Sequence, residues 1–337
     1  MYEGISYAKR LLRIGAAAVL ALFLCSSTLA MAVDVTEERP RMLIPVGHTV
    51  GIKLFARGVV VVKLPDGGTP ARACGLRTGD IIMSCGGAAV TSTEQFQSLL
   101  QKNGARSTDL QVRRDGDSMT LSVAPSQNEQ GVYCIGAWIR DSMAGIGTMT
   151  YVDPATGAFG ALGHGITDVD TAQLMPFSNG SILPSTVKAV KKGTVGAAGE
   201  LRGDFDLTQD LGTLYANTSS GVFGTLTELE TSSLPAAVPV GAARTGPALI
   251  RCNIQGDTVR EYEIEILKVV SNAADGRDMV LSVTDPALLA ATGGIVQGMS
   301  GSPILQDGKL IGAVTHVLLN DPARGYGIAI ETMLNAA

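Results

Sequence analysis

The chain has 337 residues, which is long enough for two domains of ordinary size, each with its own hydrophobic core. Hydrophobic residues make up 45% of the sequence and charged residues only 17%, and this balance excludes a disordered protein. The net charge is −5 and the sequence contains no large basic block, so nucleic acid is not an expected partner.

The N-terminal segment, residues 1–33, is expected to be an export signal or a membrane anchor. Basic residues precede an apolar stretch at 14–33, and because positive charge stays cytoplasmic, the rest of the chain is expected to be exported. Ala30-Met31-Ala32 resembles a signal peptidase site, but about 20 apolar residues could also span a bilayer uncleaved. Both alternatives stay open. The charged, proline-bearing residues 34–47 are predicted to be a linker.

Residues 48–125 are predicted to form a small α/β domain. Ser92 followed by Gln95 indicates a helix capping box, with apolar residues following at helical spacing. Two short runs around Asp115-Gly116 are expected to pair as a hairpin. The most specific stretch is PARACGLRTGDIIMSCGG at 70–87, which resembles a PDZ domain of the bacterial protease type.

The PDZ resemblance implies that this domain binds an extended peptide as an added strand, often through the C-terminal carboxylate of the peptide. We expect the peptide-binding backbone to be Gly51, Ile52, Lys53 and Leu54. The alternative is that the domain only packs against the domain that follows it.

After a connector at 126–140, residues 141–337 are predicted to form a second domain with many short strands and little helix, which favours a β-barrel or a sandwich. The fold as a whole is therefore expected to be mainly β. A turn is expected at 153–157. The main predicted strands are 147–152, 158–162, 187–191, 221–226, 262–270, 279–283 and 310–316.

The segment Gly298-Met299-Ser300-Gly301 is a candidate nucleophile turn. A catalytic serine needs a sharp turn that exposes its Oγ, and glycines on both sides permit that backbone. In trypsin-like enzymes the amides of the serine and of the residue two before it form the oxyanion hole. Here those amides belong to Ser300 and Gly298. The alternative is an ordinary Gly/Ser turn between two strands.

His164, between two glycines at the end of an apolar strand, is the candidate general base. A lone histidine is more often structural, but a partner such as Ser300 further along the chain matches the order in trypsin-like enzymes. His316 is expected to be structural or to flank the substrate, and His48 to be inert.

Together these segments resemble the SpoIVB peptidases (stage-four sporulation protein B). The motifs are GHGITD at 163–168 and the highly specific QGMSGSPILQDGKLIGAVTHVLLNDPARGYGIAIE at 297–331. The resemblance implies a PDZ domain, a trypsin-like β-barrel and serine endopeptidase activity, with His164 and Ser300 as catalytic residues. It also implies a location between the two membranes around a forming spore, and self-cleavage near the N-terminus. There the enzyme would cleave a regulator of an intramembrane protease and so activate a late sporulation sigma factor.

The same resemblance maps the acid of the triad to Asp285. However, Asp285 precedes a proline and an Ala/Leu run that ends at a glycine, which is the pattern of a helix N-cap. A dyad in which a backbone carbonyl or water orients His164 is also open. In trypsin-like folds the acid usually follows the histidine on the first barrel, a position that would suit Asp204, Asp206 or Asp210.

The main alternative function is a catalytically inactive PDZ-containing scaffold that recruits partners. The intact turn at 298–301 together with His164 favours an enzyme, because an inactive protease needs neither. No metal or cofactor is expected, since the cysteines form no CxxC pair. Those after the N-terminal segment are expected to be small buried hydrophobes: Cys74, Cys85, Cys134 and Cys252.

Overall fold

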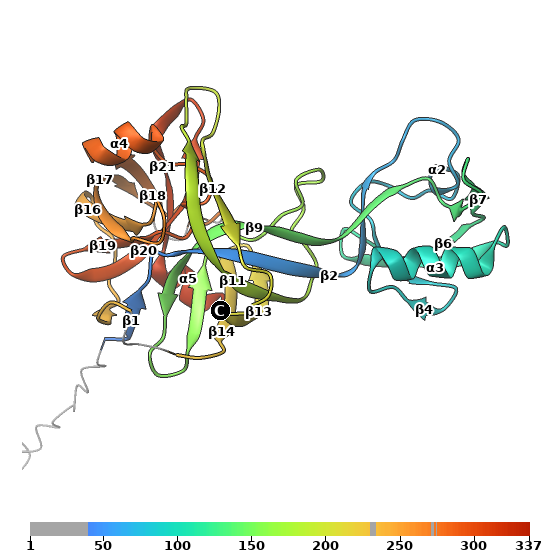
Figure 1. Cartoon of the computed structure of the whole chain (residues 1–337), viewed down its shortest axis with the longest axis horizontal. Coiled ribbons are helices and arrows are strands. Elements are labelled where there is room, and N and C mark those ends of the chain that lie inside the picture. The colour runs from blue at the N-terminus through green and yellow to red at the C-terminus, as the bar shows by residue number, and fades with distance from the viewer. Residues whose placement is uncertain (1–39, 230–233, 271–272, 274) are drawn as a thin grey trace, which may run out of the picture. The chain divides into compact units, whose positions relative to one another are not determined.

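The computed structural model describes residues 40–229, 234–270, 273 and 275–337, and this part of the chain is mainly β (Figure 1). The predicted signal or anchor at 1–33 and the start of the predicted linker lie outside the described residues. Within the described ranges, no helix is both long enough and apolar enough to cross a membrane.

Six antiparallel strands close into a first barrel, because β9 pairs with β10 on one side and with β2 on the other. Alternate residues point into its apolar core, which includes Ile52, Phe159 and Ile182. In spatial order the strands are β9 (Trp138–Val152), β10 (Ala158–Ala161), β14 (Gly221–Leu226), β13 (Gly212–Thr218), β11 (Phe177–Lys191) and β2 (Thr49–Lys63). Strands β1 (Met42–Pro45), β12 (Glu200–Phe205) and β15 (Val238–Pro239) extend the sheet.

A second barrel of six strands is closed in the order β16-β17-β18-β21-β20-β19. Along β17 the buried Ile264 and Ile266 alternate with Glu263 and Glu265, which confirms the half-buried strand predicted there. The strands are β16 (Gly246–Cys252), β17 (Arg260–Val269), β18 (Met279–Val283), β19 (Pro303–Gln306), β20 (Lys309–Leu318) and β21 (Asp321–Ala329). Two helices, α4 (Pro286–Thr292) and α5 (Ile330–Asn335), complete this part of the chain.

The domain predicted to be a PDZ domain is the small α/β unit drawn around α3 in Figure 1. Ser92 caps α3 by accepting a hydrogen bond from the amide of Gln95, as predicted, while the Gln95 side chain reaches back to Thr91. Asp115 and Gly116 have positive φ and join β5 to β6. Its elements are α2 (Pro70–Ala73), β3 (Ile81–Cys85), β4 (Ala88–Ala89), α3 (Thr93–Asn103), β5 (Thr108–Arg114), β6 (Asp117–Val123), β7 (Ser126–Gln127) and β8 (Tyr133–Cys134).

Two long strands belong to both the first barrel and the PDZ domain. The first half of β2 pairs with β9 and β11 in the barrel, and its second half, from Val59, enters the PDZ core. The structural border of the PDZ domain therefore differs from the predicted start at 48. The predicted connector at 126–140 also contributes to the PDZ core, through Ile135. Leu43 and Ile44, predicted as linker, are buried in strand β1.

The structure places Gly51–Leu54 in the wall of the first barrel and not in a peptide groove. Gly51 is paired with Ile146 on β9 and with Leu183 on β11, and the following residues are paired on both sides in the same way. Strand addition needs an unpaired edge, because an added peptide bonds to free backbone groups. The predicted peptide-binding role of these four residues is incompatible with this pairing.

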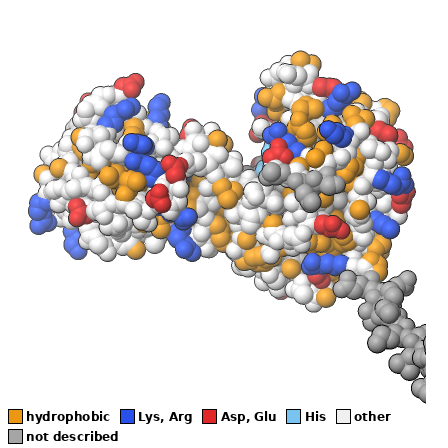
Figure 2. All heavy atoms as spheres, turned by 180° about the vertical axis from the view of Figure 1, so that it is seen from behind, with side chains coloured by type: hydrophobic (Ala, Val, Ile, Leu, Met, Phe, Trp, Pro, Cys, Tyr) orange, Lys and Arg blue, Asp and Glu red, His pale blue; other side chains and the backbone are white. Residues whose placement is uncertain are grey.

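On the face shown in Figure 2, acidic and basic side chains are interspersed among uncharged ones. Some large apolar side chains are nevertheless exposed, among them Val169 at 78% and Leu319 at 51%. Cys74, Cys85, Cys134 and Cys252 are all free. Burial raises the pKa of Cys252 to about 12, so its thiol stays protonated and unreactive.

Candidate active site

The Ser300 turn leads into β19 of the second barrel and is held against β9 of the first. The hydroxyl groups of Thr148 and Thr150 donate hydrogen bonds of 2.7 and 2.8 Å to the carbonyl oxygens of Gly298 and Gly301. The amide of Thr148 donates to the carbonyl of Ser300 at 2.9 Å. These bonds fix the turn between the two barrels.

Glycine is required at position 301 in this turn. Gly301 has a φ of +95°, and a β-carbon there would overlap the carbonyl oxygen of Thr148. Gly298 also has a positive φ, of +96°. The two glycines therefore allow the sharp, closely packed turn that places Ser300 at the surface of a pocket.

The amides of Gly298 and Ser300 are available for an oxyanion. The amides of Met299, Gly301 and Ser302 all donate to backbone carbonyls. In the described part of the chain, those of Gly298 and Ser300 donate to no protein acceptor. Two such donors beside a serine hydroxyl are the arrangement that stabilises the charge of a tetrahedral intermediate.

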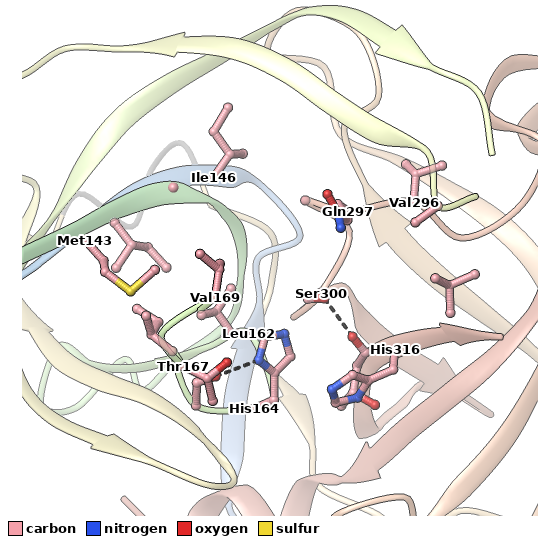
Figure 3. A pocket seen from close by; sticks show the side chains of 18 of the residues that line it. Met143, Ile146, Leu162, His164, Thr167, Val169, Val296, Gln297, Ser300 and His316 are labelled. Carbon is pink, nitrogen blue, oxygen red and sulfur yellow. Dashed lines mark hydrogen bonds between the residues drawn. The ribbon is translucent and has the colours of Figure 1, made fainter. Parts of the chain in front are cut away.

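His164 follows β10 of the first barrel and lines the same pocket as Ser300 (Figure 3). Leu162 and Gly163, with φ of +69° and +68°, turn the chain before it. Its Nδ1 lies 2.9 Å from the carbonyl oxygen of Gly165. Because a carbonyl only accepts hydrogen bonds, Nδ1 carries the proton and Nε2 keeps the free lone pair that a general base needs.

Ser300 does not donate its proton to His164 in this structure. Its Oγ donates to the carbonyl oxygen of Thr315 on β20 at 2.7 Å, the dashed line between Ser300 and the β20 strand in Figure 3. Catalysis therefore requires the hydroxyl to rotate away from Thr315 toward the histidine. His316, the next residue on β20, lies beside His164, with ring centroids 4.9 Å apart and ring planes tilted by 38°.

Burial lowers the pKa of His164, although the hydrogen bond with Gly165 opposes this. The pKa of His316 is lowered to about 4, first by partial burial of its ring and then by His164 and Arg277. Both imidazoles are thus neutral at neutral pH, which is the state that a base must have before it accepts a proton.

We predict that the acidic limb of the pH profile of kcat/KM lies below 6.5, the ordinary pKa of histidine. The base is active only when deprotonated, and its pKa is lowered, so activity should persist to more acidic pH than for an exposed histidine. Initial rates from pH 4 to 8 would measure this limb. A midpoint above 6.5 would contradict the buried, carbonyl-bonded His164 as the base.

Asp285 is the N-cap of α4, the structural role that its sequence context indicated. Its carboxylate accepts hydrogen bonds from the amides of Leu288 and Glu263 at 2.9 and 3.4 Å. It is not among the described residues that line the pocket of His164. The alternatives Asp204, Asp206 and Asp210 are exposed, and across the described ranges no carboxylate hydrogen-bonds to the His164 ring. The identity of the acid stays a prediction.

Asp285→Ala is expected to destabilise the protein by about 1 kcal/mol, because the cap of α4 is lost, whereas Asp285→Asn should retain the cap and the stability. Thermal melts of the two variants would test this. Peptidase assays on the same samples decide the catalytic role. A loss of roughly 10⁴-fold in Asp285→Asn, without a change in melting temperature, would make it the orienting acid implied by the resemblance.

Sequence reasoning missed the residues that hold the site together from a distance. Thr148 and Thr150 lie in a strand whose pattern carries no sign of catalysis, and the sequence alone assigns no role to Asp168. In the structure Asp168 is almost fully buried, at 1% exposure, and is paired with Arg140. The position of Asp168 in the GHGITD motif was the only available signal.

The serine of the second barrel and the histidine that follows β10 of the first line one pocket, an arrangement that suits a serine peptidase. Residues 131–334 match the sequence profile of the SpoIVB peptidase S55 family, and residues 61–114 match that of a PDZ domain. The first match covers more than half of the chain, so the protein belongs to the SpoIVB peptidase S55 family. It is a serine peptidase with a PDZ domain, which confirms the suspected resemblance.

Individual relatives match only parts of the chain. Serine protease HTRA1 of Xenopus tropicalis is 39% identical over 70 residues, which are 21% of this chain and 15% of that protein. Zinc metalloprotease RasP of Oceanobacillus iheyensis is 32% identical over 65 residues, 19% of this chain and 15% of that protein. The chain thus spans about 15% of the length of these curated relatives.

Solved structures resemble the chain only weakly. The PDZ domain of an SdrC-like protein from Listeria monocytogenes is 20% identical, covers 25% of this chain and 87% of that one, and has a TM-score of 0.23. The Rv3671c protease in its inactive form is 14% identical, covers 56% of this chain and 81% of that one, and has a TM-score of 0.33. TM-scores this low do not establish a shared fold.

Proposed function

We propose that this serine peptidase is an endopeptidase in which Ser300 is the nucleophile and His164 the general base. The observation that supports this most directly is one pocket that joins the Ser300 turn, with two unused amides, to a histidine whose Nε2 is free. The inactive scaffold is disfavoured, since it would need neither the amides nor the histidine tautomer.

In the proposed reaction, the Ser300 hydroxyl leaves Thr315 and turns to Nε2 of His164. Its Oγ attacks the scissile carbonyl carbon while Nε2 takes the proton. The carbonyl oxygen, now negative, accepts hydrogen bonds from the amides of Gly298 and Ser300. The imidazolium then protonates the leaving amine, and an acyl-enzyme remains on Ser300. Water then attacks the acyl carbon while His164 takes its proton. His164 returns that proton to Ser300 Oγ as the second product leaves, which restores the hydroxyl. The Gly165 carbonyl keeps the Nδ1 proton in place throughout.

A reagent that needs no known substrate tests the chemistry. Diisopropyl fluorophosphate phosphorylates activated serines, so it should label the full chain once, on the peptide that contains Ser300. Intact and peptide mass spectrometry would show the site. Labelling elsewhere, or none at conditions that label trypsin, would contradict the proposed nucleophile.

The biological role that we propose follows the family. The peptidase is exported, is held at a membrane by its N-terminal segment, and acts between the forespore and mother-cell membranes. There it cleaves a regulator of an intramembrane protease, and also itself near the N-terminus. Support comes from the SpoIVB family match and from the basic-then-apolar N-terminus. Incubating the purified chain with the exported part of such a regulator tests this role, and an uncut regulator would refute it.

The PDZ domain is proposed to bind an extended peptide, in a groove other than Gly51–Leu54. The profile match supports the binding mode. Trp138 is the single tryptophan of the chain, is 64% exposed, and begins the strand that leaves the PDZ domain, so its fluorescence can report binding. We predict a saturable change on adding peptides with free C-termini, including one made from residues 34–47. Equal responses to sequence-scrambled peptides would contradict specific binding.

A further inference from the structure

The cavity around Ser300 and His164 is large and uncharged. Its volume is about 810 Å³, and among the described residues that line it none is Asp, Glu, Lys or Arg. Aliphatic side chains dominate the lining, as Figure 3 shows for Met143, Ile146, Val169 and Val296. Apolar side chains that remain exposed in a cavity beside a nucleophile indicate a surface that a substrate covers.

The geometry of attack decides which wall meets which part of the substrate. The scissile carbonyl must sit between Ser300 Oγ and the amides of Gly298 and Ser300. The acyl-side residue, whose own carbonyl this is, therefore lies against the segments that flank the turn. Those are Ile295–Gln297, just before it, and Thr315–Val317 on β20, which holds the Ser300 hydroxyl, with Leu319 just after that strand. The substrate residue on the leaving-amine side of the scissile bond lies toward His164.

Strand β20 also offers a backbone edge at this place. Strand β19 begins at Pro303, whose partner on β20 is Ala313, and beyond it Val314 pairs with residues of the Ser300 turn. From Thr315 onward, β20 is paired only with β21 among the described strands. An extended substrate can add to this open edge, with the acyl-side side chain beside Val317 and Leu319.

We infer that the enzyme selects an uncharged aliphatic residue on the acyl side of the scissile bond. This inference rests on the proposed function, because the same Ser300 performs the reaction. A charged side chain placed there would lose its water without gaining a partner, and that cost is large. A leucine-sized side chain instead buries its surface against Val317, which is half-buried, and Leu319, which is exposed. We expect a preference of about 100-fold or more over lysine or glutamate.

Peptidyl diphenyl phosphonates test this preference, because they present only the acyl-side residue and bond to the serine. Three probes with leucine, lysine or glutamate at that position, and otherwise identical, are incubated with the full chain. The second-order labelling rate is read by intact mass. Leucine is expected to label about 100-fold faster than the other two. Equal or faster labelling by lysine or glutamate would overturn the inference.

A matched pair of variants locates the effect. Val317→Asp puts a carboxylate on the acyl-side wall and is expected to narrow the leucine-to-lysine ratio about tenfold or more. Leu207→Asp adds the same charge at a side chain that is 65% exposed and is not among the described residues that line the cavity, so it should leave the ratio within about threefold. The reverse result would overturn the assignment of the wall. If diisopropyl fluorophosphate labels Ser300 but leucine is not preferred, only the inference fails; if neither reagent labels it, the proposed function fails too.

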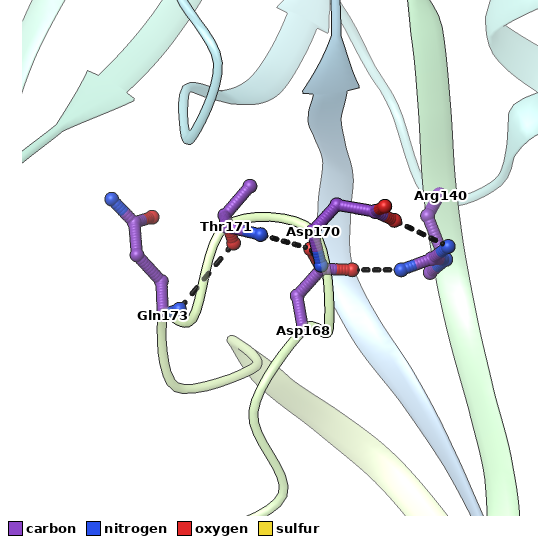
Figure 4. A network of polar contacts seen from close by, with 5 residues as sticks. All are labelled: Arg140, Asp168, Asp170, Thr171 and Gln173. Atoms are coloured by element: carbon purple, nitrogen blue, oxygen red, sulfur yellow. Dashed lines mark hydrogen bonds and ion pairs between the residues drawn. The ribbon is translucent and has the colours of Figure 1, made fainter.

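A second, independent observation concerns the loop that follows His164, shown in Figure 4. The carboxylate of Asp168 accepts hydrogen bonds from the amides of Asp170 and Thr171 at 3.0 and 2.9 Å. Arg140 of β9 donates to the other Asp168 oxygen and, at 2.8 Å, to Asp170. Burial alone would raise the pKa of Asp168, but the bonds from Thr171 and the ion pair with Arg140 outweigh it and lower the pKa.

The loop is tied to His164 at its other end. The Gly165 carbonyl accepts the Nδ1 hydrogen bond, and the side chain of Asn217 binds both the amide and the carbonyl of Ile166. Only Ile166 and Thr167 separate Gly165 from the Asp168 anchor. Asp168 and Asn217 thus hold the short segment next to the carbonyl that sets the ring of His164.

We propose that Asp168, which Arg140 holds in place, is a positioning residue for His164. Arg140 pairs with Val60 at the point where β2 and β9 leave the barrel for the PDZ domain, so the anchor of the base lies at the junction of the two domains. Loss of the anchor should slow the chemical step more than it weakens binding, because misplacing a base by about 1 Å costs up to about 100-fold in rate.

Saturation kinetics with the leucine phosphonate separate these effects. In Asp168→Asn, kinact is expected to fall about 10- to 100-fold and KI to stay within about threefold. Arg140→Gln changes a partly exposed side chain, so this variant should fold and should also have a lower kinact. The double variant should lose no more kinact than Asp168→Asn alone. Asp307→Asn, which breaks an exposed ion pair with Arg244, is the control. Unchanged kinact in a folded Asp168→Asn or Arg140→Gln, or a change confined to KI, would overturn the proposal.

Discussion

Full-length protein carrying Ser300→Ala is expected to lose at least about 10⁴-fold of its peptidase activity. The hydroxyl is the atom that bonds to the substrate, and no other described serine has both a pocket position and two unused amides beside it. The fold should survive, because the half-buried hydroxyl makes one hydrogen bond, to Thr315. Peptide hydrolysis, self-trimming at the N-terminus and a thermal melt would measure these outcomes.

Ser302 provides a control within the same turn. It is fully buried, and its Oγ donates to the Met299 carbonyl at 2.7 Å. Ser302→Ala should therefore cost about 1 kcal/mol of stability and leave most of the activity. A folded Ser300→Ala protein that still hydrolyses peptides would exclude the serine mechanism. An inactive wild type that binds PDZ peptides would instead favour the scaffold.

Local patterns allowed much of the fold to be predicted. Strands β14 and β18 lie at 221–226 and 279–283, as predicted, and the turn after Asp153 closes with a hydrogen bond from the amide of Gly157 at 2.9 Å. The long strands β2 and β9 were not foreseen at full length. Hydropathy shows that a segment is extended, but not that its two halves pair in different domains.

In the active site, too, local sequence patterns are predictable and long-range contacts are not. The Ser300 turn and the His164 segment are recognisable because glycines mark backbone that other residues cannot adopt. What holds them comes from far away in the sequence: Thr148 from β9, Thr315 from β20 and Arg140 from the PDZ junction. Such contacts exist only after folding, and their residue types are ordinary in a strand. Asp285 shows the converse, since its local pattern correctly indicated a cap.

His164→Ala is expected to lower kcat by about 10⁴-fold, because no other group can take the Ser300 proton with the same tautomer control. His316→Ala, a matched change on the neighbouring ring, should cost less than about tenfold. The two ring centroids lie 4.9 Å apart, so the two variants compare the loss of neighbouring imidazoles from the same pocket. Of these two rings, His164 has its Nδ1 fixed by a carbonyl, whereas no described residue hydrogen-bonds to the ring of His316. The leucine phosphonate and a peptide substrate would both report the loss. If His316→Ala proved the more damaging change, His316 would be the base, and Thr315–His316 on β20 would have to swing toward Ser300 during the reaction.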